Sequence, residues 1–391
     1  MKITAIRPIT VHAGDRNWIF VRVETDQPGL YGWGEGTLEW KTRAVVGCVE
    51  DFVPMLLGRD PRDISWLHER MIKHSFWPLG VIGLTAVSAI EQALWDILGK
   101  DCGKPVWQLL GGRARERVRV YAHISSSKRD LRRRPLDPEA YADGAREMVA
   151  KGYNALKCGP APYTHYATDR DGVRRMERLA VMLREAVGPD VDLLFDFHGR
   201  ASTIGAAVAY TKALAACDPM FVEEPVQPGD PDAMRMVADR SNVPLAAGER
   251  LLTLPEFQAL ADRRAVSFFQ PDLCHCGGFT VGRQIAAIGA AAQIGIAPHN
   301  PMGPIASVVG LHFAVATPNF VILEQLSDRI SHFAAVADVP ITLRDGCWEI
   351  PDRPGLGVEI DMAEAARHPF EQESIAAREA INQHDGSIVH W

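Results

Sequence analysis

The 391-residue chain lacks several features that would assign it to a specialised class of protein. Lys and Arg number 42 against 49 Asp and Glu, so no excess of positive charge favours nucleic acid or an anionic membrane as a partner. No run of about 18 apolar residues is present, and the opening segment MKITAIRPITVHAGD has no signal-peptide core. These absences predict a cytoplasmic protein whose partner is a small molecule, with neither nucleic acid nor membrane involved.

Cysteine is too scarce and too scattered for a disulfide framework. The chain has seven cysteines, an odd number, which is typical of reduced thiols. Cys274 and Cys276 form the one close pair, with His275 between them, but no second Cys/His pair stands at zinc-finger spacing. The sequence therefore favours a purely structural role over metal binding for this pair.

A glycine-rich phosphate loop is also missing, because no G-x-G-x-x-G follows the strand-like run VRVYAHI. This disfavours an open doubly wound sheet. Apolar runs instead alternate with amphipathic helical segments such as 139–152, 173–188 and 281–295. The eight runs cover residues 118–124, 155–159, 192–198, 220–226, 244–250, 266–272, 295–300 and 321–325. Eight strands with seven crossovers predict an α/β fold, a (β/α)7β TIM-like barrel.

The flanking regions differ in character from the repeating part. Residues 1–117 begin with β-rich sequence, turn at DQPG and continue with helical patterns, which predicts a separate α+β capping domain. Residues 118–344 would form the catalytic barrel. Residues 345–391 return to turns and short strands, and we expect them to pack back on the capping domain.

Ionisable residues stand at the end of nearly every predicted strand. Barrel enzymes have their active sites at these strand ends. A buried charge without a partner is too costly to be part of a hydrophobic core. Asp196 and His198 in LLFDFHGR are two positions apart on one predicted strand, so both should point to the same side. The strand-end residues are Lys157, Asp196, His198, Glu223, Glu224, Glu249, Asp272, His299 and Glu324.

Three carboxylates from successive strands converge in this arrangement: Asp196, either Glu223 or Glu224, and Glu249. Like charges so close would raise one another's pKa unless a cation kept them ionised. Hard oxygen ligands suit Mg²⁺, or alternatively Mn²⁺. The pattern therefore predicts a metal site.

The same residues carry a resemblance to a known family. The motifs DFHGR, FVEEP, PLAAGER, APHNPMGPIA and ILEQ in the barrel, with YGWGEG and ALWDILGK before it, resemble the enolase superfamily, mandelate racemase subgroup, and most of all its D-galactonate dehydratase family. The resemblance implies that Glu223 rather than Glu224 is the metal ligand. It also implies that Asp272 and His299 form a dyad, and that His198 matches the second histidine of acid-sugar dehydratases.

The chemistry implied by this resemblance is a carbon–oxygen lyase reaction, the dehydration of a D-galactonate-like aldonate in carbohydrate catabolism. His299 would take the C2 proton and His198 would protonate the departing 3-hydroxyl, giving a 2-keto-3-deoxy acid. Glu324 would hydrogen-bond the substrate carboxylate or the enediolate oxygen, which would require it to be protonated or oriented by a donor. Because relatives are commonly oligomeric, we expect a homo-oligomer.

Several alternatives stay open at this stage. Gluconate, mannonate or arabinonate could replace galactonate, and a racemase, a cycloisomerase or a non-catalytic sugar-acid-binding barrel is conceivable. A lysine-based racemase is disfavoured because Gly159 stands where the second lysine of racemases would follow Lys157. We therefore expect Lys157 near the metal ligands, as a substrate-binding residue.

Two loops do not align with the galactonate enzymes, residues 125–138 and 160–171. In the second loop, Tyr163, His165 and Tyr166 either contact the sugar or pack on the surface. In the first loop, the arginine run 132–134 is more typical of a solvated or subunit-facing segment than of a ligand clamp.

Overall fold

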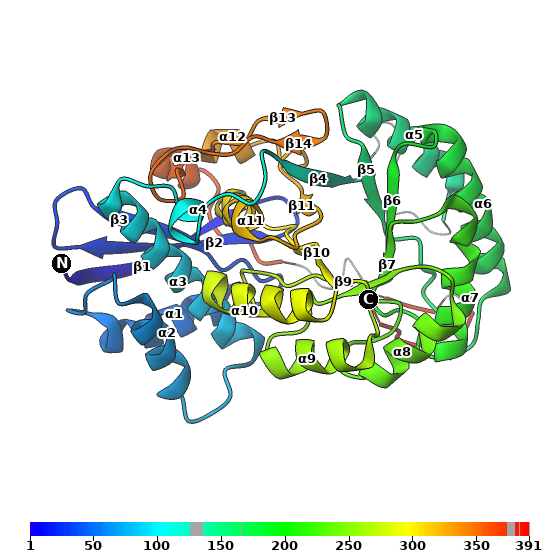
Figure 1. Cartoon of the computed structure of the whole chain (residues 1–391), viewed down its shortest axis with the longest axis horizontal. Coiled ribbons are helices and arrows are strands. Elements are labelled where there is room, and N and C mark those ends of the chain that lie inside the picture. Colours follow the sequence, from blue (N-terminus) through cyan, green and yellow to red (C-terminus); the bar gives the residue numbers. More distant parts are fainter. Residues whose placement is uncertain (126–135, 165, 374–379, 383, 391) are drawn as a thin grey trace.

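The computed structural model describes residues 1–125, 136–164, 166–373, 380–382 and 384–390, and Figure 1 shows its arrangement. The chain begins with a three-stranded antiparallel sheet in the order β1–β2–β3. Its strands are β1 Ile3–His12, β2 Asn17–Thr25 and β3 Tyr31–Glu35, followed by helices α1 Thr42–Leu56, α2 Ile64–Lys73, α3 Gly80–Cys102 and α4 Val106–Leu109.

The glycines of YGWGEG allow α3 to pack directly on the backbone of β3. A Cβ at Gly32 would lie 2.0 Å from the carbonyl oxygen of Ala93, and one at Gly34 would lie 1.9 Å from that of Ala89. No side chain fits at either distance. The motif therefore fixes the closest helix–sheet contact of the first domain.

Helix α3 is long and apolar enough to cross a membrane by length and composition, with one 18-residue window of mean hydropathy 1.4. However, 72% of that window is buried inside the protein. Its polar residues bind other elements: Gln92 bonds the backbone of Glu35 and of Leu273, and Asp96 accepts from the amides of Trp33 and Leu356. It is the core helix that joins the sheet to the barrel.

The second part of the chain is a closed parallel barrel, which confirms the expected (β/α)7β fold with an α+β cap. Consecutive strands β4 to β10 are paired in order, and β11 pairs with β4. The strands are β4 Val118–His123, β5 Ala155–Cys158, β6 Asp192–Asp196, β7 Phe221–Glu223, β8 Leu245–Ala247, β9 Phe268–Phe269, β10 Gly295–Ile296 and β11 Leu323–Gln325. The crossover helices are α5 Pro138–Ala150, α6 Arg170–Val187, α7 Ile204–Ala213, α8 Pro231–Arg240, α9 Leu254–Arg263, α10 Gly278–Ala291 and α11 Pro304–Ala316.

The barrel interior is built in layers with the two-residue period of β-strands. A buried apolar layer is followed, two residues further along most of the strands, by a mainly polar layer at the carboxyl ends. The apolar layer contains Tyr121, Ala155, Leu194, Phe221, Ala246, Ala297 and Ile322. The positions two residues later are His123, Lys157, Asp196, Glu223, Gly248, His299 and Glu324.

The observed strands are shorter than expected at these carboxyl ends. Strand β6 stops at Asp196, so strand alternation does not bring His198 to its side as the sequence suggested. The backbone turns instead, since His198 has a φ of 50° and Glu224, after β7, has a φ of 40°. Non-glycine residues held in this region are strained, and such strain is found at functional sites.

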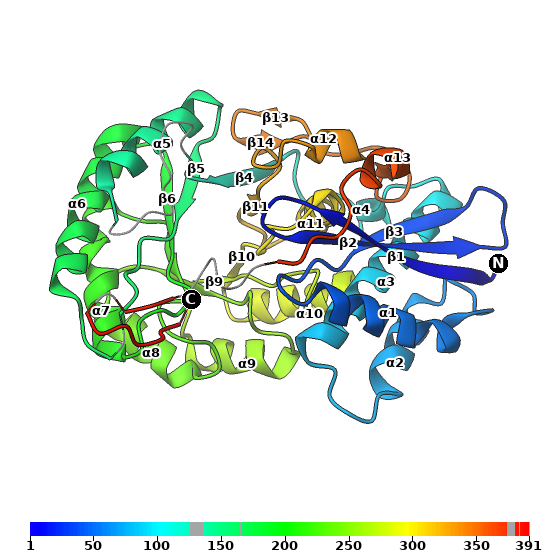
Figure 2. The same cartoon turned by 180° about the vertical axis from the view of Figure 1, so that it is seen from behind.

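The C-terminal segment returns from the barrel to the first domain and then to the barrel again. It contains α12 Phe333–Val336, β12 Ala337–Asp338, β13 Leu343–Arg344, β14 Cys347–Trp348, β15 Glu359–Ile360 and α13 Met362–Ala365. Strand β14 pairs with β4, while Glu373 accepts from the backbone amides of Asn17 and Trp40. Ala380 and Val389 then pack on Tyr163 at the barrel, where Figure 2 also places the C-terminus. The domain limits at residues 117 and 344 stay a prediction.

Candidate active site

A cavity of about 1380 Å³ lies over the carboxyl ends of the barrel strands. Loops of the first domain line one side of it through Arg16, Trp40 and Lys41. The barrel lines the other side, and the tail adds His384 and His390. The cavity is therefore assembled from segments at both ends of the chain.

Lys157 on β5 is surrounded by carboxylates. It is 1% exposed, and its Nζ lies 2.9 Å from Glu223 Oε2, 2.8 Å from Glu324 Oε1 and 3.4 Å from Asp196 Oδ2. Burial would lower its pKa, but the surrounding carboxylates, led by Glu223, raise it well above the usual value. Lys157 is thus a cation at neutral pH that partly balances the acidic layer.

Glu223 remains incompletely satisfied despite this lysine. It is fully buried, and its Oε1 has no hydrogen-bond partner. Burial and the nearby charge of Asp196 raise its pKa to about 8. A buried carboxylate oxygen without a donor is costly unless a ligand completes it.

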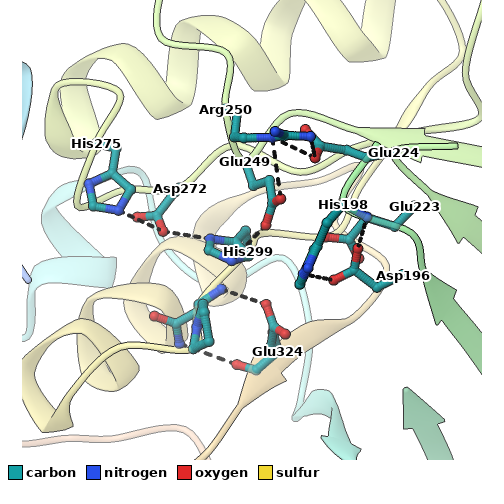
Figure 3. Close-up of polar contacts among 12 residues, drawn as sticks. Asp196, His198, Glu223, Glu224, Glu249, Arg250, Asp272, His275, His299 and Glu324 are labelled. Carbon is teal, nitrogen blue, oxygen red and sulfur yellow. Dashed lines mark hydrogen bonds and ion pairs between the residues drawn. The ribbon is translucent and has the colours of Figure 1, made fainter. Parts of the chain in front are cut away.

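The next strand brings Glu249 to the same cavity, with Glu224 behind it. Burial would raise the pKa of Glu249, but His299 lowers it to about 2. Glu224 points to Arg250, whose Nε and Nη2 lie 2.7 Å and 2.5 Å from its Oε2. The two glutamates of the EEP motif are therefore divided, because Glu223 contacts Lys157 whereas Glu224 contacts Arg250, and Figure 3 shows the contact of Glu224.

His299 lies between two carboxylates. Its Nδ1 is 2.7 Å from Asp272 Oδ2, and its Nε2 is 2.9 Å from Glu249 Oε2. Burial would lower the pKa of His299, but Glu249 and Asp272 raise it well above the ordinary value. The expected pairing of Asp272 with His299 is present in the geometry, and Figure 3 shows it.

His198 lies close to Asp196 after the turn. Its Nε2 is 2.9 Å from Asp196 Oδ2, and its backbone amide donates to Asp196 Oδ1 at 3.0 Å. On the other side of the ring, Nδ1 lies 3.2 Å from the Nη2 of Arg200. One potential metal-ligand atom from each of Asp196, His198 and Glu249 lies within 4.8 Å of the other two.

Glu324 on β11 is fully buried, and both of its carboxylate oxygens contact hydrogen-bond donors. His123 Nε2 lies 2.5 Å from its Oε1, and the amide of Asn300 donates to its Oε2 at 2.9 Å. Burial would raise the pKa of Glu324, but Lys157 and His123 lower it well below the usual value. It is therefore an ionised acceptor in this structure.

The residues expected to contact the sugar are placed less uniformly. Tyr163 lines the cavity with only 8% of its surface exposed. Tyr166 is 69% exposed and is not among the cavity-lining residues. His165 and the arginine run 132–134 lie outside the described residues. Loop residues 160–164 line the cavity.

The CHC pair sits behind the dyad. Cys274 and Cys276 are buried, and the amide of Cys274 donates to Asp272 Oδ1 at 2.6 Å. His275 Nδ1 lies 2.9 Å from Thr85 Oγ1 of α3 and its Nε2 lies 3.5 Å from Asp272 Oδ2. The pair therefore supports the loop that carries Asp272.

Sequence reasoning did not identify four residues of this site. They are His123, Arg200, His275 and Asn300, and all four contact a strand-end residue that it did identify. His123 had a detectable signal, because it follows Tyr121 by two residues on a barrel strand. Arg200 and Asn300 lie in loops, where no periodicity marks them.

The fold and the site together define a class of protein. It is a capped barrel whose strand ends hold carboxylates, a buried lysine and two histidines in one cavity. Such a constellation is an enzyme active site rather than a structural core.

Comparison with known proteins identifies the family. Residues 3–111 match the model described as "Mandelate racemase / muconate lactonizing enzyme, N-terminal domain", and residues 140–365 match "Enolase C-terminal domain-like". A D-galactonate dehydratase of Verminephrobacter eiseniae is 35% identical over 400 residues, covering 100% of both chains. The chain belongs to the enolase superfamily.

Solved structures agree with this assignment. A candidate galactarate dehydratase of Agrobacterium radiobacter, crystallised with Na and L-malate, is 33% identical with a TM-score of 0.91 and covers 100% of both chains. A candidate mandelate racemase/muconate lactonizing enzyme of Burkholderia SAR-1 is also 33% identical, with a TM-score of 0.87 over 100% of this chain and 96% of the other. These relatives support the expected enzyme class, a hydro-lyase of the dehydratase type.

Proposed function

We propose that the chain is a Mg²⁺-dependent dehydratase of an acid sugar, with D-galactonate as the first substrate to test. One observation carries the proposal: two histidines with different partners face one cavity beside three carboxylates. His299 has Asp272 at its Nδ1, whereas His198 stands beside Asp196. One histidine can act as base and the other as donor to the leaving group.

The residues fit a divalent cation. Asp196, Glu223 and Glu249 would hold it, because Mg²⁺ prefers oxygen donors and Glu223 Oε1 has no other partner. His198 lies within reach of the same point, but imidazole suits Mg²⁺ poorly. When bound, the cation stabilises the negative charge that develops on the substrate carboxylate as its C2 proton is removed.

The base must be the neutral form of His299. Asp272 holds the proton on Nδ1, so the lone pair of a neutral ring is on Nε2. That nitrogen faces the Glu249 carboxylate in this structure, so it donates here; it becomes available for the C2 proton when the contact with Glu249 is released and the ring loses its Nε2 proton. His198 presents Nε2 to the same cavity and would supply the proton for the departing 3-hydroxyl.

Glu324 needs a change of protonation or a donor for the role that the sequence suggested. An ionised carboxylate accepts hydrogen bonds and cannot donate one to a substrate carboxylate. Its contacts with His123 and Lys157 favour the ionised form. We propose that Glu324 mainly orients these two side chains, and that direct contact with the substrate carboxylate requires its protonation.

The relatives support the substrate class. The V. eiseniae protein is named for D-galactonate, and the A. radiobacter structure holds L-malate, itself a hydroxy acid. We propose an aldonate such as D-galactonate as the substrate here, and a homo-oligomer as the working form.

The first experiment screens the purified enzyme with Mg²⁺ against a set of aldonates and aldarates, scoring 2-keto-3-deoxy products. We expect turnover of at least one acid sugar, and none after dialysis against a chelator. Full turnover without a divalent cation would contradict the metal requirement. Absence of product from every acid sugar would contradict the dehydratase assignment.

A second experiment separates the two histidines by NMR of the substrate in deuterated buffer. His299→Asn should abolish both dehydration and exchange at C2, because no base remains. His198→Asn should keep C2 exchange while dehydration falls by about 10²–10⁴-fold, the usual contribution of a general acid. Exchange that survives in His299→Asn and disappears in His198→Asn would reverse the roles.

A further inference from the structure

The side chain of Arg200 is fixed from three directions next to His198. Its Nη1 donates to the carbonyl oxygen of Ala161 at 3.1 Å, and its Nη2 lies 3.2 Å from His198 Nδ1. Its guanidinium carbon lies 4.4 Å from the centre of the Tyr163 ring. Only 6% of the residue is exposed, so these contacts rather than solvent set its position.

This contact determines which ring nitrogen of His198 carries the proton. A guanidinium has only donors, so the nitrogen opposite it must be an acceptor. Nδ1 of His198 is therefore unprotonated, and the proton is on Nε2.

The two histidines of the cavity have opposite partners at Nδ1, although each has a carboxylate 2.9 Å from Nε2. His299 has a carboxylate at Nδ1, 2.7 Å away, whereas His198 has a cation there. A carboxylate at Nδ1 leaves the lone pair of a neutral ring on Nε2, whereas a cation at Nδ1 leaves a proton on Nε2. Once the contact of His299 with Glu249 is released, the partners at Nδ1 distinguish the acceptor from the donor of the site.

We infer that Arg200 is a positioning residue that holds His198 as the Nε2–H tautomer and so restricts it to donating. In this state His198 can neither take the C2 proton nor offer Nε2 to a metal ion. The inference on catalysis rests on the proposed dehydratase function, whereas the tautomer assignment does not.

The proton balance is consistent with this role. As the C3–O bond breaks, its electron pair goes to the oxygen, which takes the proton from Nε2 and leaves as water. The electron pair of the N–H bond stays on the ring, and the resulting negative charge lies next to the guanidinium at Nδ1. Arg200 would therefore stabilise the ring after donation as well as orient it before.

The tautomer can be measured directly on the full-length enzyme with Mg²⁺ and without substrate. Two-bond ¹H–¹⁵N correlation spectra of histidine-labelled protein distinguish protonated from unprotonated ring nitrogens, and His198→Asn identifies the signals of His198. We expect wild-type His198 to be unprotonated at Nδ1. A protonated Nδ1 would overturn the inference.

Variants then test whether Arg200 is the cause. In Arg200→Met, Nδ1 loses its donor, so we expect a mixture of tautomers at His198. Arg200→Lys keeps a cation that can only donate, and we expect it to retain more of the Nε2–H form than Arg200→Met. Arg184→Met is the matched control, because Arg184 binds the carbonyl oxygens of Gly188, Val191 and Cys217 away from the cavity. If Arg200→Met shifts the unfolding midpoint and leaves the His198 signals unchanged, its role is structural only and the inference fails.

Kinetics of the same variants test the catalytic part. Dehydration by Arg200→Met should fall by about 10- to 100-fold in kcat, the effect typical of outer partners of a site, with little change in KM. Exchange at C2 should persist, because His299 is untouched. Equal loss of exchange and dehydration would contradict a role through His198. If no acid sugar is turned over at all, the proposed function fails while the tautomer measurement still decides the assignment.

Discussion

Glu91 on α3 gives a stability prediction that links the first domain to the loop after Asp272. It is fully buried and accepts from the amides of Phe279 and Thr280 at 3.0 Å and 2.9 Å, at the start of α10. Trp95 Nε1 donates to it as well, at 2.9 Å. Burial nevertheless raises the pKa of Glu91 to about 7 from the ordinary 4.5. The perturbation is Glu91→Gln, which keeps the shape and removes the titration.

The sign follows from proton uptake. Between pH 4.5 and about 7 the folded chain binds a proton at Glu91 that the unfolded chain has lost, so the free energy of unfolding falls as the pH rises. At 1.36 kcal/mol per pKa unit, the full effect is about 3 kcal/mol, of which about 2 kcal/mol falls between about pH 5 and pH 7.5. Burial of Glu35 raises its pKa to about 7 too, so wild type should lose stability from both groups in this window.

The assay is urea unfolding followed by tryptophan fluorescence and by circular dichroism at both pH values. Glu91→Gln should be less stable than wild type at low pH, because the N–H groups of its side-chain amide would face the N–H donors that now point at Glu91. We expect this to lower the free energy of unfolding by about 1–3 kcal/mol. Its stability should, however, depend less on pH by about 2 kcal/mol. Glu50→Gln, an exposed change on α1, is the control and should keep the wild-type slope. A wild-type slope in Glu91→Gln would refute the reasoning.

Three further predictions concern the site and the domain contact. Glu249→Gln should weaken Mg²⁺ binding, measured by calorimetry, because one of three proposed ligands loses its charge; unchanged affinity would remove Glu249 from the ligand set. Lys157→Met should lower the free energy of unfolding by about 3–5 kcal/mol in chelator, because it leaves buried carboxylates without their cation, and by less with Mg²⁺; equal losses in both conditions would contradict a shared role. Gly34→Ala should lower the unfolding temperature, because its Cβ would lie 1.9 Å from the carbonyl oxygen of Ala89, whereas Gly47→Ala meets nothing within 4 Å and should be neutral or stabilising. Equal stability of these two glycine variants would show that β3 and α3 can separate freely.

The sequence by itself determined the barrel and most of the acidic layer. Strand and helix periods are local, and a parallel barrel places the carboxyl ends of all its strands on one side. Asp196, one of Glu223 and Glu224, Glu249 and Glu324 could therefore be assigned to one cavity before any contact was known. The resemblance added the choice of Glu223 over Glu224 as metal ligand, which stays a prediction; in the structure Glu224 contacts Arg250.

Only the tertiary structure decided how these groups are partnered. Lys157 was expected near the metal ligands, but its contact with Glu324 depends on barrel closure between β4 and β11. The position of the His198 side chain depends on the left-handed backbone conformation of this residue after β6 rather than on strand alternation. No periodic pattern encodes either feature, because both arise where the chain leaves its strands.

The protonation of the two histidines shows the same division. The sequence places Asp272 and His299 on neighbouring strands, and the family pattern pairs them. Arg200 stands two residues after His198 in the printed sequence, yet nothing local indicates that its guanidinium returns to Nδ1 of that ring. That return is fixed by the carbonyl of Ala161 and the ring of Tyr163, which belong to the loop after β5. Which nitrogen carries the proton is therefore a property of the folded loops, because hydrogen-bond direction depends on partners that only the fold brings together.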